Sequence, residues 1–150
     1  MACYSFRMGR LLLGILKGGA IGALLGWAAL KVGVAGGFGA GVTYAAIGAL
    51  VGLVCGKPIW RQETIWTSIL KGLFGLGAAI GLYVLSRKLL GGVHVDFAAS
   101  LGAPADRPLV DIPLLLGPLV GAVPGIFFEI DDAVGATPAK AVPSAPEKKK

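Results

Sequence analysis

Charged, histidine and cysteine residues are all scarce in this chain of 150 residues. Only 15% of the residues are charged while 55% are hydrophobic, so there is too little polar side chain to cover a soluble globule. The mean hydropathy of +0.79 points the same way and favours an integral membrane protein. The two cysteines, Cys3 and Cys55, are expected on the cytosolic side, where thiols stay reduced, and are interpreted as small packing residues.

Motifs of catalysis are lacking as well. The chain has no nucleophile elbow, no phosphate-binding loop and no HExxH or CxxC pattern, so we expect neither an enzyme nor a cofactor. The formal net charge of +6 comes from basic residues that flank apolar runs or end the chain, without a basic stripe interleaved with aromatics. This distribution argues against nucleic acid and leaves the lipid bilayer and other membrane subunits as expected partners.

Glycine, by contrast, is abundant and regularly spaced. In the apolar run 11–30, LLLGILKGGAIGALLGWAAL, a glycine occupies every fourth position, and the same spacing returns in three later apolar segments. On a helix such a row replaces a ridge with a groove that admits a second backbone, which is a glycine zipper. The predicted packing residues are Gly14, Gly18, Gly22 and Gly26; Gly48, Gly52 and Gly56; Gly77 and Gly81; and Gly117, Gly121 and Gly125.

The apolar segments predict an all-α integral membrane fold with four transmembrane helices, at about 9–31, 38–56, 64–90 and 112–130. Residues 1–132 form the membrane domain, and residues 133–150 read as a disordered tail of Ala, Pro and Lys. Pro118 and Pro124 each remove a backbone hydrogen bond, so the fourth helix is expected to be kinked or broken. Alternating polar and apolar residues after position 92 predict a small β-hairpin-like outer loop over 93–111.

An internal repeat relates the two halves of the membrane domain. Ile15-Leu16-Lys17-Gly18 returns as Ile69-Leu70-Lys71-Gly72, and GALVGLVCG at 48–56 resembles GPLVGAVPG at 117–125. We interpret these matches as two tandem glycine-zipper hairpins, repeat A at about 9–63 and repeat B at about 64–130, with an insertion at 93–110. More basic residues lie at the helix ends that would face the cytosol than at the opposite ends. Both termini are therefore predicted to be cytosolic, in the inner membrane of a bacterium.

Two features could carry a more specific activity. Lys17 and Lys71 occupy matching positions just inside their helices and could bind an ion or a lipid headgroup, although lysines there also extend to the interface without a ligand. The break at Pro118 and Pro124 could expose carbonyls to a substrate, or be a kink that only fits the bundle. His94, Asp96, Asp106 and Asp111 have no recognised metal-ligand spacing, and no metal is predicted.

In outline, four short helices with small-residue rows, the Gly56-Lys57 step and Trp66-Thr67-Ser68 resemble the mitochondrial inner-membrane protein translocases. The resemblance implies a class of scaffold or lateral-groove membrane subunits without chemistry of their own. The predicted function is thus a non-enzymatic, tightly packed subunit or scaffold of a larger or homo-oligomeric membrane complex. The alternative is a small channel or carrier whose path is lined by Lys17, Lys71 and the broken fourth helix.

Overall fold

The described part of the chain is all-helical. A computed structural model describes residues 2–34, 36–55, 65–103 and 106–135. Its elements in chain order are α1 (Ala2–Val32), α2 (Gly37–Val54), α3 (Ile65–Leu90), the 3-10 helices η2 (Asp96–Leu101) and η3 (Leu109–Asp111), and α4 (Pro113–Gly135). Gly56 and residues 136–150 of the predicted tail lie outside these residues. Residues 133–135, which were also predicted to belong to the disordered tail, instead form the end of α4.

Four helices are long and apolar enough to cross a membrane, which indicates a multi-pass membrane protein. The candidate spans are Met8–Val32, Gly37–Val54, Ile65–Leu90 and Pro113–Asp131. Apolar composition predicted the first residue of three of the four helices to within about one residue. Helix α1 is the exception, because it begins at Ala2, well before its apolar run. Hydropathy marks where a span enters lipid, whereas a helix can continue into polar sequence beyond that point.

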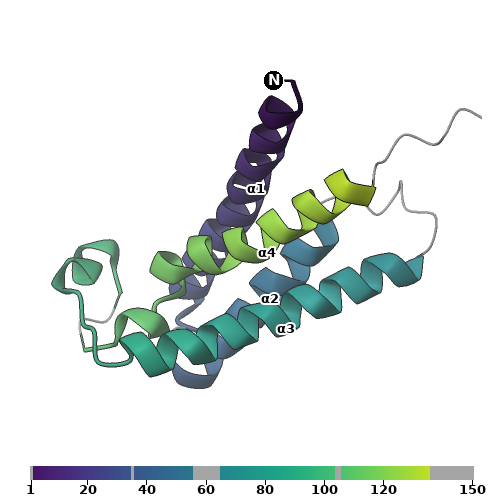
Figure 1. Cartoon of the computed structure of the whole chain (residues 1–150). Helices are drawn as coiled ribbons and strands as arrows, with labels where there is room; N and C mark the ends of the chain where they lie inside the picture. The colour runs from purple at the N-terminus through teal and green to yellow at the C-terminus, as the bar shows by residue number, and fades with distance from the viewer. Residues whose placement is uncertain (1, 35, 56–64, 104–105, 136–150) are drawn as a thin grey trace, which may run out of the picture.

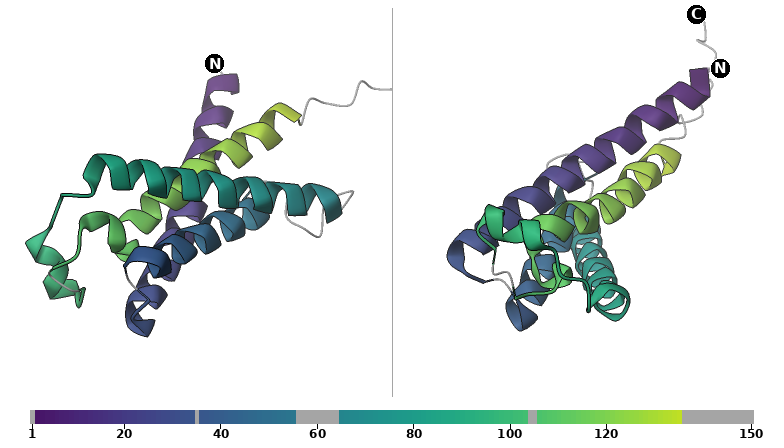
Figure 2. Two further views of the ribbon diagram at one scale, coloured as in Figure 1. Left: turned by 90° about the horizontal axis from the view of Figure 1, so that it is seen from below. Right: turned by 90° about the vertical axis from the view of Figure 1, so that its left-hand side faces the viewer.

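The helices pack as two antiparallel pairs that are nested in the sequence. Helix α1 packs most extensively on α4, and α2 on α3 (Figure 1). Figure 2 shows the α1–α4 pair lying across the α2–α3 pair. Consecutive helices α1 and α2 contact each other less, and α3 and α4 less again. The pairing therefore differs from two hairpins that each pack within themselves.

The link between α1 and α2 depends on glycine. Gly33, Gly36 and Gly37 adopt positive φ values of 74°, 103° and 53°. Side chains other than glycine seldom tolerate this region, so the chain can reverse here within a few residues.

The outer loop between α3 and α4 differs from the expected hairpin. One antiparallel bridge joins His94 to Pro108, and the Leu109 amide donates to the Val93 carbonyl at 2.8 Å. From Asp96 the chain turns into η2 instead of continuing as a strand. Pro108 has no amide hydrogen with which to extend a ladder, and the alternating stretch is too short to form a stable pair by itself. The β-hairpin prediction for 93–111 is wrong apart from this bridge.

Helix α4 runs through both prolines. Pro118 and Pro124 lie inside a single helix from Pro113 to Gly135, so the helix is not broken at either residue. Pro113 lies in the first turn, where no amide donor is needed. The carbonyls left without a helical partner by the prolines do not interrupt the helix, since the flanking turns keep their own hydrogen bonds.

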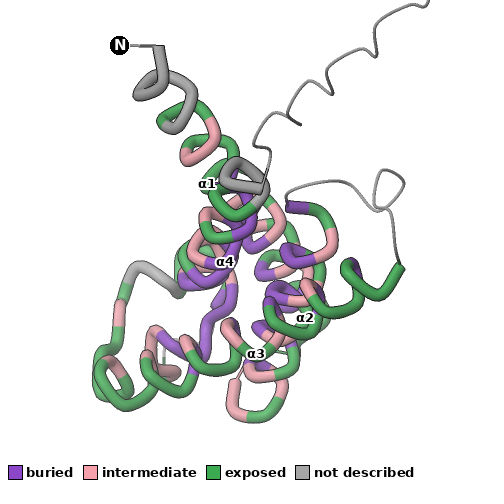
Figure 3. Tube along the Cα trace, turned by 45° about the vertical axis from the view of Figure 1, so that its right-hand side comes forward, coloured by how far each residue is buried: buried purple, intermediate pink, exposed green. Residues whose placement is uncertain are grey.

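The core follows one face of α2. Ala40, Tyr44, Ile47, Val51 and Cys55 recur at three- and four-residue intervals and are fully buried. Figure 3 shows burial concentrated where the four helices meet, with exposed residues along their outer faces. Many of those exposed side chains are large and apolar, for example Phe38 at 89% and Leu16 at 73% exposure. Such a surface is unfavourable in water and suits contact with lipid.

Candidate functional site

The α1–α4 contact brings two backbones together through paired glycines. As the residue number rises along α1 it falls along α4: Gly14 faces Gly125, Gly18 faces Gly121 and Gly22 faces Gly117. A Cβ placed on Gly14 would lie 2.7 Å from the Gly125 carbonyl oxygen, and a Cβ on Gly18 or Gly22 would overlap the facing carbonyl outright. Larger residues at these positions would have to push the helices apart.

The same row continues at the far end of α1. A Cβ on Gly26 would overlap the carbonyl of Pro113, the first residue of α4. All four glycines predicted in the first span thus lie against α4. The sequence did not indicate which helix they would face, because four-residue spacing describes a groove and carries no information about the partner.

The α2–α3 contact uses glycine over a shorter length. Gly48 lies against Gly75, and Gly52 lies against Lys71 and Gly72 of α3. On α3 the buried small residues are Ser68, Gly72, Gly75 and Ala79, which we call the α3 stripe. The predicted packing residues did not include Gly72 and Gly75, because the pattern used for the prediction was glycine at every fourth position. Counting serine and alanine as small and allowing alternating intervals of four and three would have found the α3 stripe.

Gly77 and Gly81 lie on an exposed face of α3. Both are exposed, and no heavy atom of the described chain beyond their own helix and neighbours lies within 4 Å of a Cβ placed on either residue. Their predicted packing role is therefore not met by a helix of the described residues.

Lys17 pairs with an acidic residue of α4. Its ammonium lies 2.7 Å from Glu129 Oε1, with the Lys17 side chain 37% exposed and the Glu129 side chain only 7% exposed. The pair spans 112 positions, so no local pattern could have identified it.

Lys71, which the predicted repeat matches to Lys17, lies beside Phe128, the residue before Glu129 on α4. Its ammonium is 6.0 Å from the centroid of the Phe128 ring, within the range of a cation–π contact. The two matching lysines therefore lie at the same end of the bundle and contact neighbouring residues, Glu129 and Phe128.

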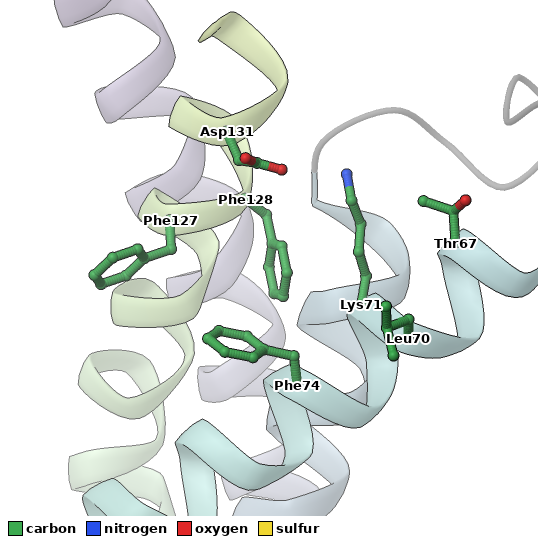
Figure 4. A pocket seen from close by; sticks show the side chains of 7 residues that line it. All are labelled: Thr67, Leu70, Lys71, Phe74, Phe127, Phe128 and Asp131. Carbon is green, nitrogen blue, oxygen red and sulfur yellow. The ribbon is translucent and has the colours of Figure 1, made fainter. Parts of the chain in front are cut away.

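A groove opens between α3 and α4 at this end of the bundle. It has a volume of about 400 Å³. Figure 4 shows its lining residues, which are Thr67, Leu70, Lys71, Phe74, Phe127, Phe128 and Asp131. Charged and apolar side chains meet here around open space.

The opposite end of the bundle is closed by tyrosines. The rings of Tyr44 and Tyr83 stack at 4.9 Å, and the Tyr44 hydroxyl donates to the Val110 carbonyl at 3.0 Å. The Tyr83 hydroxyl lies 3.0 Å from both Asp111 Oδ1 and the Gly37 carbonyl, which can share its hydrogen. Asp111 is thereby held in the helix packing, where it is buried. Within the described ranges, no three His, Cys, Asp or Glu side chains converge as metal ligands.

Comparison with known proteins adds no relative. The chain matches no protein-family model, and neither the curated proteins nor the solved structures contain a match.

Proposed function

We propose that this protein is a non-enzymatic subunit or scaffold of a membrane complex, formed with other subunits or with further copies of itself. The observation that carries the proposal is the outward-facing row of Gly77 and Gly81 on α3. Glycine inside a helix costs about 1 kcal/mol relative to alanine. The glycines that pack closely within the chain offset that cost; they are Gly14, Gly18, Gly22, Gly26, Gly48, Gly52, Gly117, Gly121 and Gly125. Gly77 and Gly81 would offset it only against a partner helix.

The surroundings of that row support a helix-packing face. Leu73, Ile80 and Val84 on the same helix are exposed at 64%, 39% and 48%. A groove without side chains, flanked by apolar side chains, lets a second backbone approach closely and gain dispersion contacts, which drive helix association in lipid.

A duplicated two-helix unit is part of the proposal, and equivalent contacts support it. Gly48 and Gly52 correspond to Gly117 and Gly121 in the repeat. The first two lie against Gly75 and Gly72 of α3, and the second two lie against Gly22 and Gly18 of α1. Gly18 and Gly72 are themselves equivalent in the repeat. The second helix of each copy thus packs on the first helix of the other copy.

We further propose the cytoplasmic membrane of a bacterium as the location, with both termini cytosolic. Lys17 and Lys71 mark the cytosolic end in this orientation, and Lys31 and Arg87 mark the outer end. The positive-inside rule supports this assignment through the additional basic residues near the first terminus and in the central loop.

The experiment compares the size of the wild-type assembly with that of Gly77→Ile/Gly81→Ile, in mild detergent and after crosslinking in vesicles. The variant is expected to keep its helical content and thermal stability, because both positions are open in the single chain, and to lose the larger assembly. Ala20→Ile, on an exposed face of α1, is the matched control and keeps the assembly. A wild-type protein that is monomeric under both conditions, or a double variant that still assembles, would overturn the proposal.

The channel or carrier is the alternative, and two of its parts are less favourable in this fold. Lys17 is paired with Glu129, and α4 continues through Pro118 and Pro124. Ion or solute flux into vesicles that disappears in Lys17→Ala/Lys71→Ala would favour the alternative over the scaffold.

A further inference from the structure

The groove between α3 and α4 has an apolar floor and open apolar edges. Phe128 forms the floor with only 6% of its surface exposed, and Phe74 meets it edge to face with ring centroids 6.0 Å apart. Leu70, Phe74 and Phe127 line the edges and are 68%, 61% and 64% exposed. A rigid aromatic floor of this kind provides a surface on which a hydrocarbon chain can lie.

The polar lining residues gather at one end of the groove. Thr67 and Lys71 lie in the first two turns of the α3 span, and Asp131 is the last residue of the α4 span. Figure 4 shows the Lys71 ammonium, the Thr67 hydroxyl and the Asp131 carboxylate toward the ends of their helices, with the three phenylalanines on the other side. Since the apolar spans begin and end here, this rim lies at the depth of lipid headgroups and the aromatic floor lies at the depth of the acyl chains.

The rim carries both signs of charge. Lys71 and Thr67 on α3 can donate hydrogen bonds to phosphate oxygens, and Asp131 on α4 can accept hydrogen bonds from an ammonium group. A headgroup with a phosphate alone would meet the Asp131 carboxylate as a like charge. A headgroup with a phosphate and a primary ammonium satisfies both helices at once, while a trimethylammonium group has no hydrogen to donate.

We propose that this groove binds one phospholipid whose zwitterionic headgroup ends in a primary ammonium, as in phosphatidylethanolamine. The phosphate contacts Lys71 and Thr67, the ammonium contacts Asp131, and one acyl chain lies along Phe74 and Phe128. The lipid would join the first turns of α3 to the last turns of α4, two helices whose mutual contact is much smaller than that of α1 with α4 or of α2 with α3. The inference is independent of the proposed scaffold function, because it needs no second protein.

The test is native mass spectrometry of the full-length protein in mild detergent, titrated separately with phosphatidylethanolamine, phosphatidylglycerol and phosphatidylcholine of identical acyl chains. The wild type is expected to bind phosphatidylethanolamine at least several-fold more tightly than the other two. A charge-assisted hydrogen bond contributes roughly 1.5–3 kcal/mol, so Lys71→Gln should weaken phosphatidylethanolamine binding by about tenfold or more. Lys88→Gln, an exposed lysine at the other end of α3, is the matched control and leaves binding unchanged.

Asp131→Asn provides a readout that loss of folding cannot imitate. Removing the carboxylate should weaken phosphatidylethanolamine binding and strengthen phosphatidylglycerol binding, which reverses the preference. Asp106→Asn, in the outer loop, is the corresponding control. Equal affinities of the wild type for the three lipids, a wild-type preference for phosphatidylglycerol, or an unchanged preference in Asp131→Asn would each overturn the proposal.

Discussion

The α1–α4 and α2–α3 contacts both bring two helix backbones close together, but they do so over different lengths. In α1–α4, glycine faces glycine at three successive levels, and a fourth level joins Gly26 to Pro113. In α2–α3, close backbone contacts of glycine are confined to Gly48 and Gly52 in the second half of α2, and stacked Tyr44 and Tyr83 lie toward the other end. A strict four-residue glycine row is therefore needed where two backbones stay close along the whole crossing. Where the helices separate, larger side chains fill the space and the spacing can alternate between three and four residues.

The contacts differ in polarity as well. The α1–α4 contact includes the Lys17–Glu129 ion pair, and the α2–α3 contact connects through Tyr83 to Asp111 at the opposite end. Charged and hydrogen-bonded groups thus lie at the ends of the bundle, while small residues form its middle. This division suits a membrane, because polar groups cost least near the interfaces.

The largest effect is expected when a side chain is forced into the middle of the α1–α4 contact. Gly22→Ile places a branched side chain on the Gly117 backbone, with the Pro118 nitrogen 2.8 Å from the new Cβ. Since backbone cannot yield as a side-chain end can, we expect no folded, monodisperse protein by size-exclusion chromatography in detergent. Gly52→Ile should act in the same way on the α2–α3 contact. Leu13→Ile, at an exposed position of α1, should behave as the wild type; a normal elution profile for both glycine variants would contradict the packing argument.

A smaller effect is expected from the ion pair of the α1–α4 contact. Lys17→Met removes the Lys17 ammonium from the buried Glu129 carboxylate and should lower the free energy of unfolding by about 1–3 kcal/mol, less than for a fully buried pair because Lys17 is partly exposed. Lys17→Met/Glu129→Met removes both charges and should recover most of the loss. Thermal or denaturant unfolding of the four proteins of this cycle in detergent measures the coupling. Additive effects of the two single substitutions would show that the pair contributes nothing.

The smallest effects are expected from alanine substitutions at Gly72 and Gly75 of the α3 stripe, and the two substitutions should differ. A Cβ at Gly75 would overlap the Gly48 carbonyl, so Gly75→Ala should cost about 1–3 kcal/mol of stability through overpacking. A Cβ at Gly72 would lie 3.2 Å from the end of the Leu53 side chain, which can move. The gain in helix propensity, about 1 kcal/mol, should then leave Gly72→Ala near neutral or slightly more stable. Equal melting temperatures for the two variants would contradict the assigned contacts.

The sequence was most informative about features that depend on residues close together in the chain. Apolar runs located the four spans, and the four-residue spacing singled out Gly14, Gly18, Gly22 and Gly26, each of which lies against another backbone. It performed worst in the outer loop, where a five-residue alternation suggested a strand and η2 formed instead. It also predicted a kink or a break at Pro118 and Pro124, and α4 is not broken at either residue. The error in the loop came from assigning a backbone conformation without knowing which neighbours would stabilise it.

By itself the sequence determined that four segments favour lipid over water and that several of them carry grooves without side chains, because hydropathy and helical spacing are properties of neighbouring residues. The tertiary structure decided which grooves meet, and it chose α1 with α4 and α2 with α3. It also brought Lys17 to Glu129 across 112 positions and left Gly77 and Gly81 on the surface. Those outcomes depend on how well whole helix faces fit one another, and a glycine row is compatible with any backbone that can approach it.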